Sequence, residues 1–327
     1  MLTERRAQLA DRYGINWRAT AIATARHGSI TSTDGIDLIE AAKLVERGEK
    51  LSGLRGSTEK KSAVELVESC DADILFETTP LNAETGEPAI TIIRRALSRS
   101  INVVTANKGP VAFAYRELKA LARQHRVGFR FEGTVMDGAP VFNLVERCLP
   151  ATNILGFSGV LNSTTNLILT AMEEGRSFDS ALAEARRLGI AEANADYDLD
   201  GWDAVVKAVA LANVLMGSNA RPQAVERRGI RDITEADVKL AAQTGRVIRL
   251  VSRARVTDGQ VRLSAMPESI LLASPLGSAR GTTNVLMIET DLMGVIAIFE
   301  HEPGVGQTAY ALLSDLISIH QAATGGY

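Results

Sequence analysis

The sequence predicts an α/β fold in which a parallel sheet is followed by a second domain of α+β structure. Two observations lead to this prediction. Through about the first 145 residues, short apolar runs alternate with amphipathic segments at the spacing of β-α-β units. After about residue 150, long helical patterns followed by consecutive strand patterns replace that alternation.

The elements of the first part follow from the period of their apolar residues. Helical spacing predicts helices over residues 2–13, 36–48, 59–69, 87–99 and 112–124. Apolar runs bounded by turn residues predict strands over residues 17–25, 72–80, 101–107 and 127–133. The segment GSITSTDG at 28–35 is expected to be a loop.

The second part begins with a predicted strand over 153–162. Two helices are expected within 163–188, and a long apolar helix over 202–216. Strands then follow, and the chain closes with a strand, a glycine-bearing turn and a helix. Arginines alternate along one predicted strand and favour a solvated sheet face over an anion site: Arg249, Arg253 and Arg255.

Composition indicates a globular protein of two domains. The 327 residues include 46% hydrophobic and 23% charged residues, and the net charge of −3 argues against a nucleic-acid partner. No segment has the pattern of a signal peptide or a membrane span. The two cysteines, Cys70 and Cys148, form no CxxC pair and suit a reducing cytoplasm. We therefore expect a cytoplasmic protein with no membrane partner.

The stretch AEANADYDLDGWDAVVK at 191–207 concentrates five carboxylates before one lysine. Counted from Asp196, it matches the start of a calcium loop, but Lys207 stands at position 12, where a bidentate glutamate is needed. A calcium site is therefore excluded. A plain structural alternative is that Asp198 or Asp200 caps the helix that begins near residue 202, with Asp203 and Lys207 as an exposed pair.

Lys207 favours a chemical interpretation of this stretch. It lies in a segment that is apolar on most sides, among Val205, Val206 and Val209, so partial burial is expected. A buried ammonium needs a carboxylate partner. Such an environment is one in which a lysine acts as an acid–base catalyst.

Two further stretches place polar residues where strands end. VVTANKGP at 103–110 puts Asn107 and Lys108 directly after an apolar strand, at the edge where open parallel sheets bind ligands. An ordinary turn is the alternative. GVLNSTTNLIL at 159–169 runs from a strand into a helix, and N-capping by Ser163 or Thr164 is its structural explanation.

The glycine pattern typical of dinucleotide-binding turns lies near the end of the sequence rather than near its start. The one G-x-G-x-x-[GA] match is Gly304–Ala309, near the end of the sequence, and no strand and glycine turn precede the first predicted helix. We expect either that Met1 is an internal start, as in a truncated reading of the gene, or that the chain is impaired in binding a cofactor.

Together VVTANKGP, LNSTTNLILTAMEEG, LGIAEANADYDLDGWDAVVK and GVGQTAYALLSDL resemble homoserine dehydrogenase, in the order of that family. The resemblance runs from residue 2 almost to the end. It implies a Rossmann-like nucleotide domain over 1–145, a substrate-binding and dimerisation domain over 146–300, and a C-terminal helix over 301–327 that returns to the first domain. It also implies a homodimer and NADP-dependent interconversion of L-homoserine and L-aspartate 4-semialdehyde in threonine and methionine biosynthesis.

The resemblance assigns roles to single residues of this sequence. Lys108 and Lys207 are expected to flank the substrate hydroxyl and exchange its proton, with Asp203 orienting Lys207. The substrate would be held by Glu192 and Asp198 at its amino-acid end, and by Thr164 with the backbone near Ser163.

The cofactor would contact Gly304, Gly306, Thr78, Thr79, Asn107 and Lys108. Arg26 follows the strand at 17–25, where an NAD-preferring site usually has an acidic residue. It can accept a 2′-phosphate, so NADP is preferred over NAD.

The sequence also departs from the family. Met136 and Asp137 stand where small residues are usual, beside Glu132 and Val135, through which the family can hold a monovalent cation such as sodium. Ser163 and Asn194 replace the usual glycine and aspartate, and this can alter substrate choice. Two alternatives therefore stay open: a dehydrogenase of another hydroxy amino acid, and a non-catalytic homologue impaired in nucleotide binding.

Overall fold

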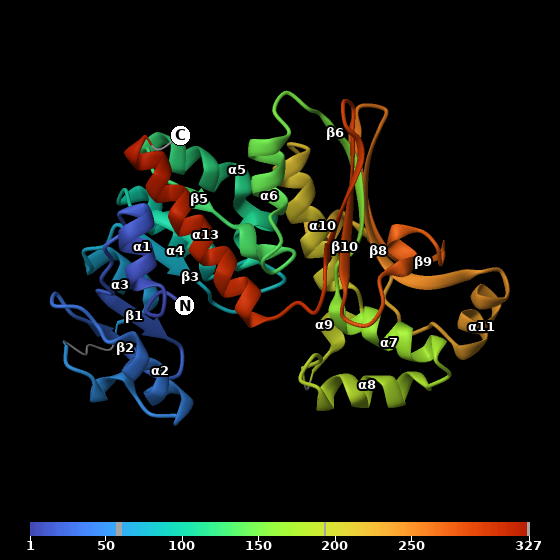
Figure 1. Ribbon diagram of the computed structural model, residues 1–327, viewed down its shortest axis with the longest axis horizontal. Helices are drawn as coiled ribbons and strands as arrows, with labels where there is room; N and C mark the ends of the chain where they lie inside the picture. The colour runs from blue at the N-terminus through green and yellow to red at the C-terminus, as the bar shows by residue number, and fades with distance from the viewer. Residues whose placement is uncertain (57–60, 193, 326–327) are drawn as a thin grey trace.

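The computed structural model describes residues 1–56, 61–192 and 194–325 and forms two lobes (Figure 1). One lobe holds the first 150 residues, drawn from blue through cyan to green, together with the C-terminal helix α13 (Val305–Thr324), drawn in red. The other lobe is built around an upright sheet. Among the described residues, no helix has the length and apolar character needed to cross a membrane.

Elements of the N-terminal lobe alternate as the sequence predicts. The helices are α1 (Arg6–Tyr13), α2 (Leu38–Glu46), α3 (Ala63–Ser69), α4 (Ala89–Ser98), α5 (Lys108–His125) and α6 (Val141–Asn143), with the short turns η1 (Leu51–Gly53), η2 (Glu132–Thr134) and η3 (Leu144–Cys148). The strands are β1 (Ala21–Thr24), β2 (Gly28–Thr31), β3 (Ile74–Glu77), β4 (Asn102–Thr105) and β5 (Phe129–Arg130).

A parallel sheet of order β3-β4-β5 positions the site. The pairs Ile74–Asn102 and Glu77–Thr105 bound the register between β3 and β4, so both strands end at the same edge. Helices α4 and α5 pack against each other, and the inward residues of β4 are fully buried. Apolar burial on both faces explains why these strands have continuous apolar runs rather than alternating ones.

The prediction for residues 17–35 was wrong in part. Only Ala21–Thr24 forms a strand, and it pairs antiparallel with Gly28–Thr31, which was expected to be a loop. Gly28 has φ of +85°, which permits the tight reversal, and Ile30 on the returning strand is buried. The helix predicted over 59–69 begins at Ala63; positions 59 and 60 lie outside the described residues.

The second lobe contains a sheet of order β11-β10-β6-β8-β9-β7, in which all pairs except β7–β9 are antiparallel. Its strands are β6 (Ile154–Val160), β7 (Glu226–Arg227), β8 (Arg246–Thr257), β9 (Gln260–Leu271), β10 (Asn284–Thr290) and β11 (Gly294–Glu300). Its helices are α7 (Ser163–Glu173), α8 (Phe178–Arg187), α9 (Asp196–Leu199), α10 (Trp202–Leu215), α11 (Glu235–Gln243) and α12 (Pro275–Ser278), with the turn η4 (Pro222–Ala224).

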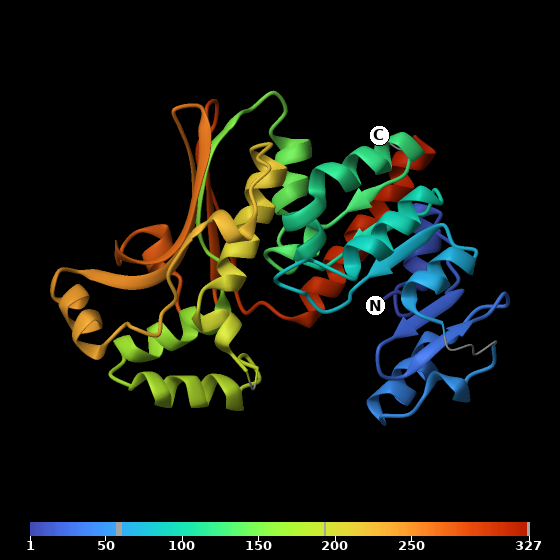
Figure 2. The same ribbon diagram turned by 180° about the vertical axis from the view of Figure 1, so that it is seen from behind.

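Helix α10 joins the two lobes. It packs against β8 and β9 on one side and against α5 of the first lobe on the other (Figure 2). This double contact explains why every residue from Asp203 to Asn213 except Lys207 is buried. A helix that is apolar all round is a buried helix. Lys207, within that run, is only partly exposed.

Arg249 corrects the prediction of a solvated arginine face. Its side chain has no exposed area, because α12 and the chain after it cover this end of the sheet. It forms an ion pair with Glu173 and donates to the carbonyl oxygens of Ala279 and Gly277. Arg253 and Arg255, farther along the strand, are partly or fully exposed as expected.

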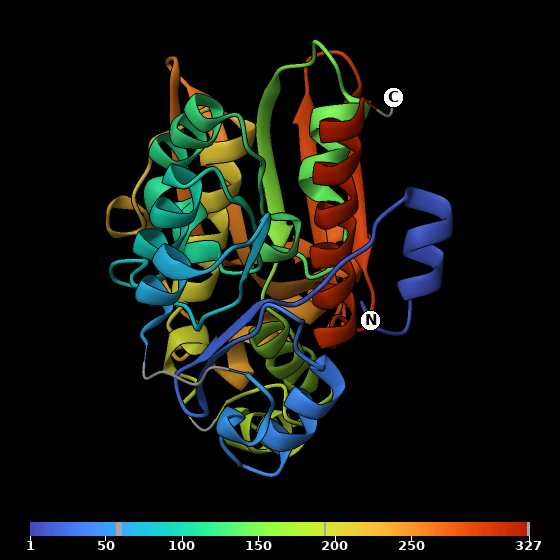
Figure 3. The same ribbon diagram turned by 90° about the vertical axis from the view of Figure 1, so that its left-hand side faces the viewer.

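Helix α13 returns to the first lobe and packs against β4 and η2. Leu313 and Leu316 share an apolar cluster with Leu9 and Ile15, so α1 and α13 lie side by side (Figure 3). Asp315 of α13 accepts a hydrogen bond of 2.8 Å from the backbone N–H of Glu132. The two ends of the described chain therefore meet on one face of the parallel sheet.

Two buried carboxylates meet at this contact. Burial raises the pKa of Asp315 to about 6 even though it accepts the Glu132 N–H. Burial likewise raises the pKa of Glu132 to about 7, against hydrogen bonds from the backbone of Asn143 and Phe142, with the nearby charge of Asp315 adding to the rise. Both groups therefore bind protons more tightly in the folded chain than in the unfolded chain.

We expect wild-type stability to fall as pH rises from about 4 to about 6, because the unfolded chain releases the Asp315 proton first. Asp315→Asn keeps an oxygen for the Glu132 N–H and removes the charge. The variant should match the wild type near pH 4 and be more stable above pH 6, by about 1–3 kcal/mol. Urea unfolding at several pH values measures this; parallel pH dependences for the two chains would contradict it.

Candidate active site

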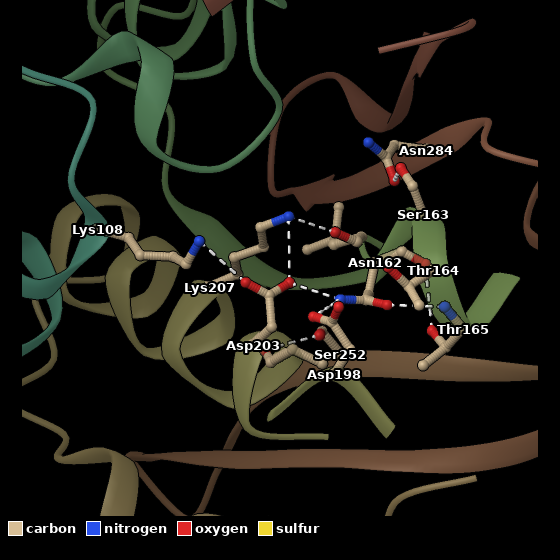
Figure 4. Close-up of polar contacts among 12 residues, drawn as sticks. Lys108, Asn162, Ser163, Thr164, Thr165, Asp198, Asp203, Lys207, Ser252 and Asn284 are labelled. Atoms are coloured by element: carbon tan, nitrogen blue, oxygen red, sulfur yellow. Dashed lines mark hydrogen bonds and ion pairs between the residues drawn. The ribbon is translucent and has the colours of Figure 1, made fainter. Parts of the chain in front are cut away.

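Lys207 projects from α10 into a small polar cluster (Figure 4). Its Nζ lies 3.3 Å from Asp203 Oδ2 and donates a 2.6 Å hydrogen bond to the carbonyl oxygen of Leu161, at the end of β6. The side chain is 14% exposed. The burial and the carboxylate partner expected from the sequence are therefore confirmed.

Lys108 reaches the same carboxylate from the other lobe. It is the first residue of α5, and its Nζ lies 2.9 Å from Asp203 Oδ1. Asn107 fixes this helix start, since its side-chain oxygen accepts from Gly109 N while its amide donates to the carbonyl oxygen of Thr79. Asn107 in the turn after β4 therefore caps helix α5 and also fixes the position of Lys108, the first residue of that helix.

Asp203 is the centre of charge in the cluster. It is 6% exposed, and burial alone would raise its pKa, but Lys108 and Lys207 hold that pKa well below the usual range. For Lys108, burial favours the neutral amine, and the charge of Asp203 more than reverses this, so its pKa is raised. The cluster therefore keeps Asp203 ionised and Lys108 protonated at neutral pH.

Sequence reasoning missed Asn162, the residue before α7. Its Nδ2 donates to Asp198 Oδ1 at 2.8 Å and to Asp203 Oδ2 at 2.9 Å. Burial and the charge of Asp203 raise the pKa of Asp198. Its role as a helix cap could have been predicted, because asparagine is a preferred capping residue and Asn162 directly precedes the helix. Its hydrogen bonds to Asp198 and Asp203 depend on the fold.

The structural alternatives for these stretches are corrected by the contacts. Gly201, with φ of +81° and no side-chain cap, precedes α10, so neither Asp198 nor Asp200 caps that helix. Asp200 instead pairs with Arg231, with 2.5 Å between the nearest atoms. Helix α7 is capped by Asn162, not by Ser163 or Thr164. The pair of Asp203 and Lys207 is buried rather than exposed.

The predicted substrate residues divide into two groups. Thr164 is buried beside Asp198 and donates to the carbonyl oxygen of Ile190. The hydroxyl of Ser163 turns away from the lysines and donates to the carbonyl oxygen of Thr282. Glu192 is exposed and has no side-chain partner among the described residues. Its role in holding a substrate stays a prediction.

Predicted cofactor residues gather at the edge where the parallel strands end. Thr78 and Thr79 follow β3, and the Thr79 hydroxyl donates to the buried carboxylate of Glu77. Helix α13 begins at Val305, directly after Gly304, and has no side-chain cap. A Cβ added at Gly306 would meet nothing within 4 Å. An uncapped helix start with open space around it suits an anionic or amide group.

Arg26 lies in the turn between β1 and β2 and is exposed. Lys50 comes beside it and donates a 2.6 Å hydrogen bond from Nζ to the Arg26 carbonyl oxygen. His27 bonds to the Glu49 carbonyl oxygen at 2.6 Å. The Lys50 ammonium therefore lies against the backbone of Arg26, and both residues are exposed at one tip of the lobe.

Glu132 is 3% exposed, and its carboxylate accepts from Phe142 N at 2.7 Å and Asn143 N at 2.8 Å. Val135 follows it, also buried. Among the described residues, no three His, Cys, Asp or Glu side chains form a group suited to a metal ion. The carboxylate is thus already supplied with donors from α6.

The family model for homoserine dehydrogenase matches residues 140–317. The chain belongs to the homoserine dehydrogenase family. The NAD(+)-dependent homoserine dehydrogenase of Pseudomonas canavaninivorans is 36% identical over 325 residues, covering 99% of this chain and 92% of that relative. The homoserine dehydrogenase of Methanocaldococcus jannaschii is 40% identical over 300 residues, covering 91% and 88%.

The fold agrees with this family. A hyperthermophilic archaeal homoserine dehydrogenase solved in complex with NADPH superposes with a TM-score of 0.83 at 32% identity, covering 98% of this chain and 93% of that one. The expected Rossmann-like α/β class is therefore confirmed, and NAD(P) is the cofactor class of these relatives.

Residues that depart from the family pattern fit the fold. Met136 is fully buried in the core. Asp137 accepts a 3.2 Å hydrogen bond from the Thr308 hydroxyl and so ties the turn after η2 to α13. The following glycine allows a close approach, because a Cβ at Gly138 would lie 2.8 Å from the Gln307 carbonyl oxygen. The turn therefore packs tightly against the start of α13.

Proposed function

We propose that this chain interconverts L-homoserine and L-aspartate 4-semialdehyde with NADP(H), as expected for the threonine and methionine pathways. The observation that carries the proposal is the convergence of Lys108 and Lys207, from different lobes, on the two oxygens of Asp203. Two ammonium groups held in this way would flank one substrate oxygen near the edge where the parallel strands end. Family membership supports the same activity.

The bound cofactor supplies hydride transfer at the substrate carbon. This chain supplies the proton at the neighbouring oxygen. Lys108 holds its proton tightly because of Asp203, so its Nζ serves to stabilise negative charge on that oxygen. Lys207 then exchanges the proton: its Nζ gives a proton to the oxygen in reduction and takes one in oxidation, while Asp203 and the Leu161 carbonyl keep it oriented.

The substrate is a zwitterion, and its ammonium group requires carboxylates. Asp198 is half-buried next to the lysine cluster, and its raised pKa reflects burial near another negative charge. A substrate ammonium would relieve that repulsion. Glu192, which is exposed and lies between α8 and α9, is the second expected partner.

We predict that Lys207→Ala lowers kcat about 10²–10⁴-fold for L-homoserine oxidation followed by NADPH absorbance. Lys207→Arg should be as impaired, because a guanidinium keeps the charge but cannot give up its proton. Lys108→Arg should retain far more activity than Lys108→Ala, since only the charge is needed there.

The wild-type assay is run on several hydroxy amino acids, in choline chloride with and without sodium. A clear preference for another hydroxy amino acid would replace the proposed substrate. A folded chain that binds no nucleotide and shows no activity would identify a non-catalytic homologue. Equal losses in the arginine variants of both lysines would overturn the division of roles between them.

We propose NADP over NAD because Arg26 and Lys50 place two cations at one tip of the lobe. Arg26→Ala should raise KM for NADP about 10–100-fold, the value of one or two charge-assisted hydrogen bonds, and leave KM for NAD nearly unchanged. Arg187→Ala, an exposed arginine on α8, is the control. An equal rise for both cofactors would show that Arg26 does not contact the 2′-phosphate.

We also propose a sodium ion near Glu132 and the backbone around Val135. The support is the burial of two neighbouring carboxylates, Glu132 and Asp315. Burial raises the pKa of both, and the hydrogen bonds that Glu132 accepts from α6 do not offset that rise. Activity or thermal stability that rises with sodium, and not with choline, would support the site. Equal activity and equal thermal stability in the sodium and choline salts would rule out the sodium site.

We propose a homodimer through the outer face of the second sheet. One face of that sheet is covered by α7, α10 and α11, while the other presents exposed apolar residues on and next to β11, including Val295 and Met293. Apolar exposure of this kind marks an interaction surface.

Light scattering should give a mass of twice 35.0 kDa for the wild type. Val295→Asp, which places a charge opposite Glu289, should give a monomer. Leu240→Asp on α11, where the side chain is 64% exposed, is the matched control and should stay dimeric. A wild type that is monomeric at assay concentrations would contradict the proposed interface.

A further inference from the structure

We propose that Asn162 is a positioning residue that couples substrate recognition at Asp198 to the orientation of Lys207 by Asp203; this rests on the proposed function. The amide of Asn162 lies between the two carboxylates, 2.8 Å from Asp198 Oδ1 and 2.9 Å from Asp203 Oδ2. Asn162 is 5% exposed, so water does not compete for these bonds.

The helix cap fixes which way the amide points. Asn162 accepts a 2.8 Å hydrogen bond from Thr165 N, and only its side-chain oxygen can accept from an N–H. The backbone carbonyl oxygen of Asn162 also accepts a hydrogen bond from Asn166 N, so backbone and side chain are both bonded to the start of α7. The NH₂ group must therefore face the opposite way, toward Asp198 and Asp203.

Both amide hydrogens are used, one on each carboxylate. Burial and the charge of Asp203 raise the pKa of Asp198, and the hydrogen bond from the Asn162 amide opposes that rise. The bond to Oδ2 also fixes the Asp203 carboxyl plane, so that Oδ1 meets Lys108 and Oδ2 meets Lys207. Among the described residues, the other side-chain groups that bind the Asp203 carboxylate are the two lysines.

Other capping residues cannot replace this function. Serine and aspartate cap helices about as well as asparagine, so Asn162→Ser and Asn162→Asp both keep the bond to Thr165 N. Serine removes the two donors to the carboxylates. Aspartate places a third negative charge between them. These variants therefore separate the role of Asn162 as a helix cap from its bridge, that is, its two hydrogen bonds to Asp198 and Asp203.

The experiment compares Asn162→Ser, Asn162→Asp and wild type in pH profiles of kcat and kcat/KM for L-homoserine. Ser177→Ala, which removes the cap of α8 away from the cluster, is the matched control for a purely structural change. We expect Asn162→Ser to lower kcat about 10–100-fold and to raise KM. Its acid limb should move upward by roughly one pH unit, because the carboxylates lose donors that favour their charged form.

Asn162→Asp should be more impaired, whereas Ser177→Ala should change melting temperature and leave the acid limb in place. The role of Asn162 would be overturned if a well-folded Asn162→Ser variant kept the wild-type acid limb of the pH profile. It would also be overturned if that variant lost no more kcat than Ser177→Ala. The carboxyl pKa values of Asp198 and Asp203, followed by NMR without substrate, supply a second test. If wild type does not act on homoserine, the proposed function fails, while an unchanged Asp198 pKa in Asn162→Ser separately refutes the bridge.

Discussion

The site depends on one buried carboxylate, Asp203, that compensates two ammonium groups brought from different lobes. Each lysine alone would be costly to bury, and each is tolerated because the same carboxylate accepts both. The arrangement exists only when α5 and α10 are in contact, since Lys108 begins one helix and Lys207 lies within the other. Packing between the two lobes therefore forms part of the candidate active site.

Several contacts keep that packing in register. Helix α10 lies between the second sheet and α5, so its apolar surface is buried on both sides. Glu300, at the end of β11, accepts a 3.1 Å hydrogen bond from Gly138 N in the first lobe. Helix α13, which follows directly, packs on β4 and η2. The last strand and the last helix thus connect the lobes close to the point where Lys108 meets Asp203.

The departures from the family pattern are accommodated by local packing. Ser163 turns its hydroxyl toward β10, away from the lysines, and Met136 fills the core. Asp137 bonds to Thr308 and joins the turn after η2 to α13. None of these side chains displaces a member of the cluster formed by Lys108, Lys207 and Asp203.

The sequence alone determined the class of fold, most helices and strands, and the pairing of Lys207 with Asp203, because periodicity and i,i+4 spacing are local properties. It also placed Lys108 correctly at a strand end. Tertiary structure decided what depends on distant segments. The ion pair that accompanies the burial of Arg249 joins it to Glu173, and the hydrogen bond of Asn162 to Asp203 spans 41 residues of the chain; no local pattern encodes the proximity of such partners.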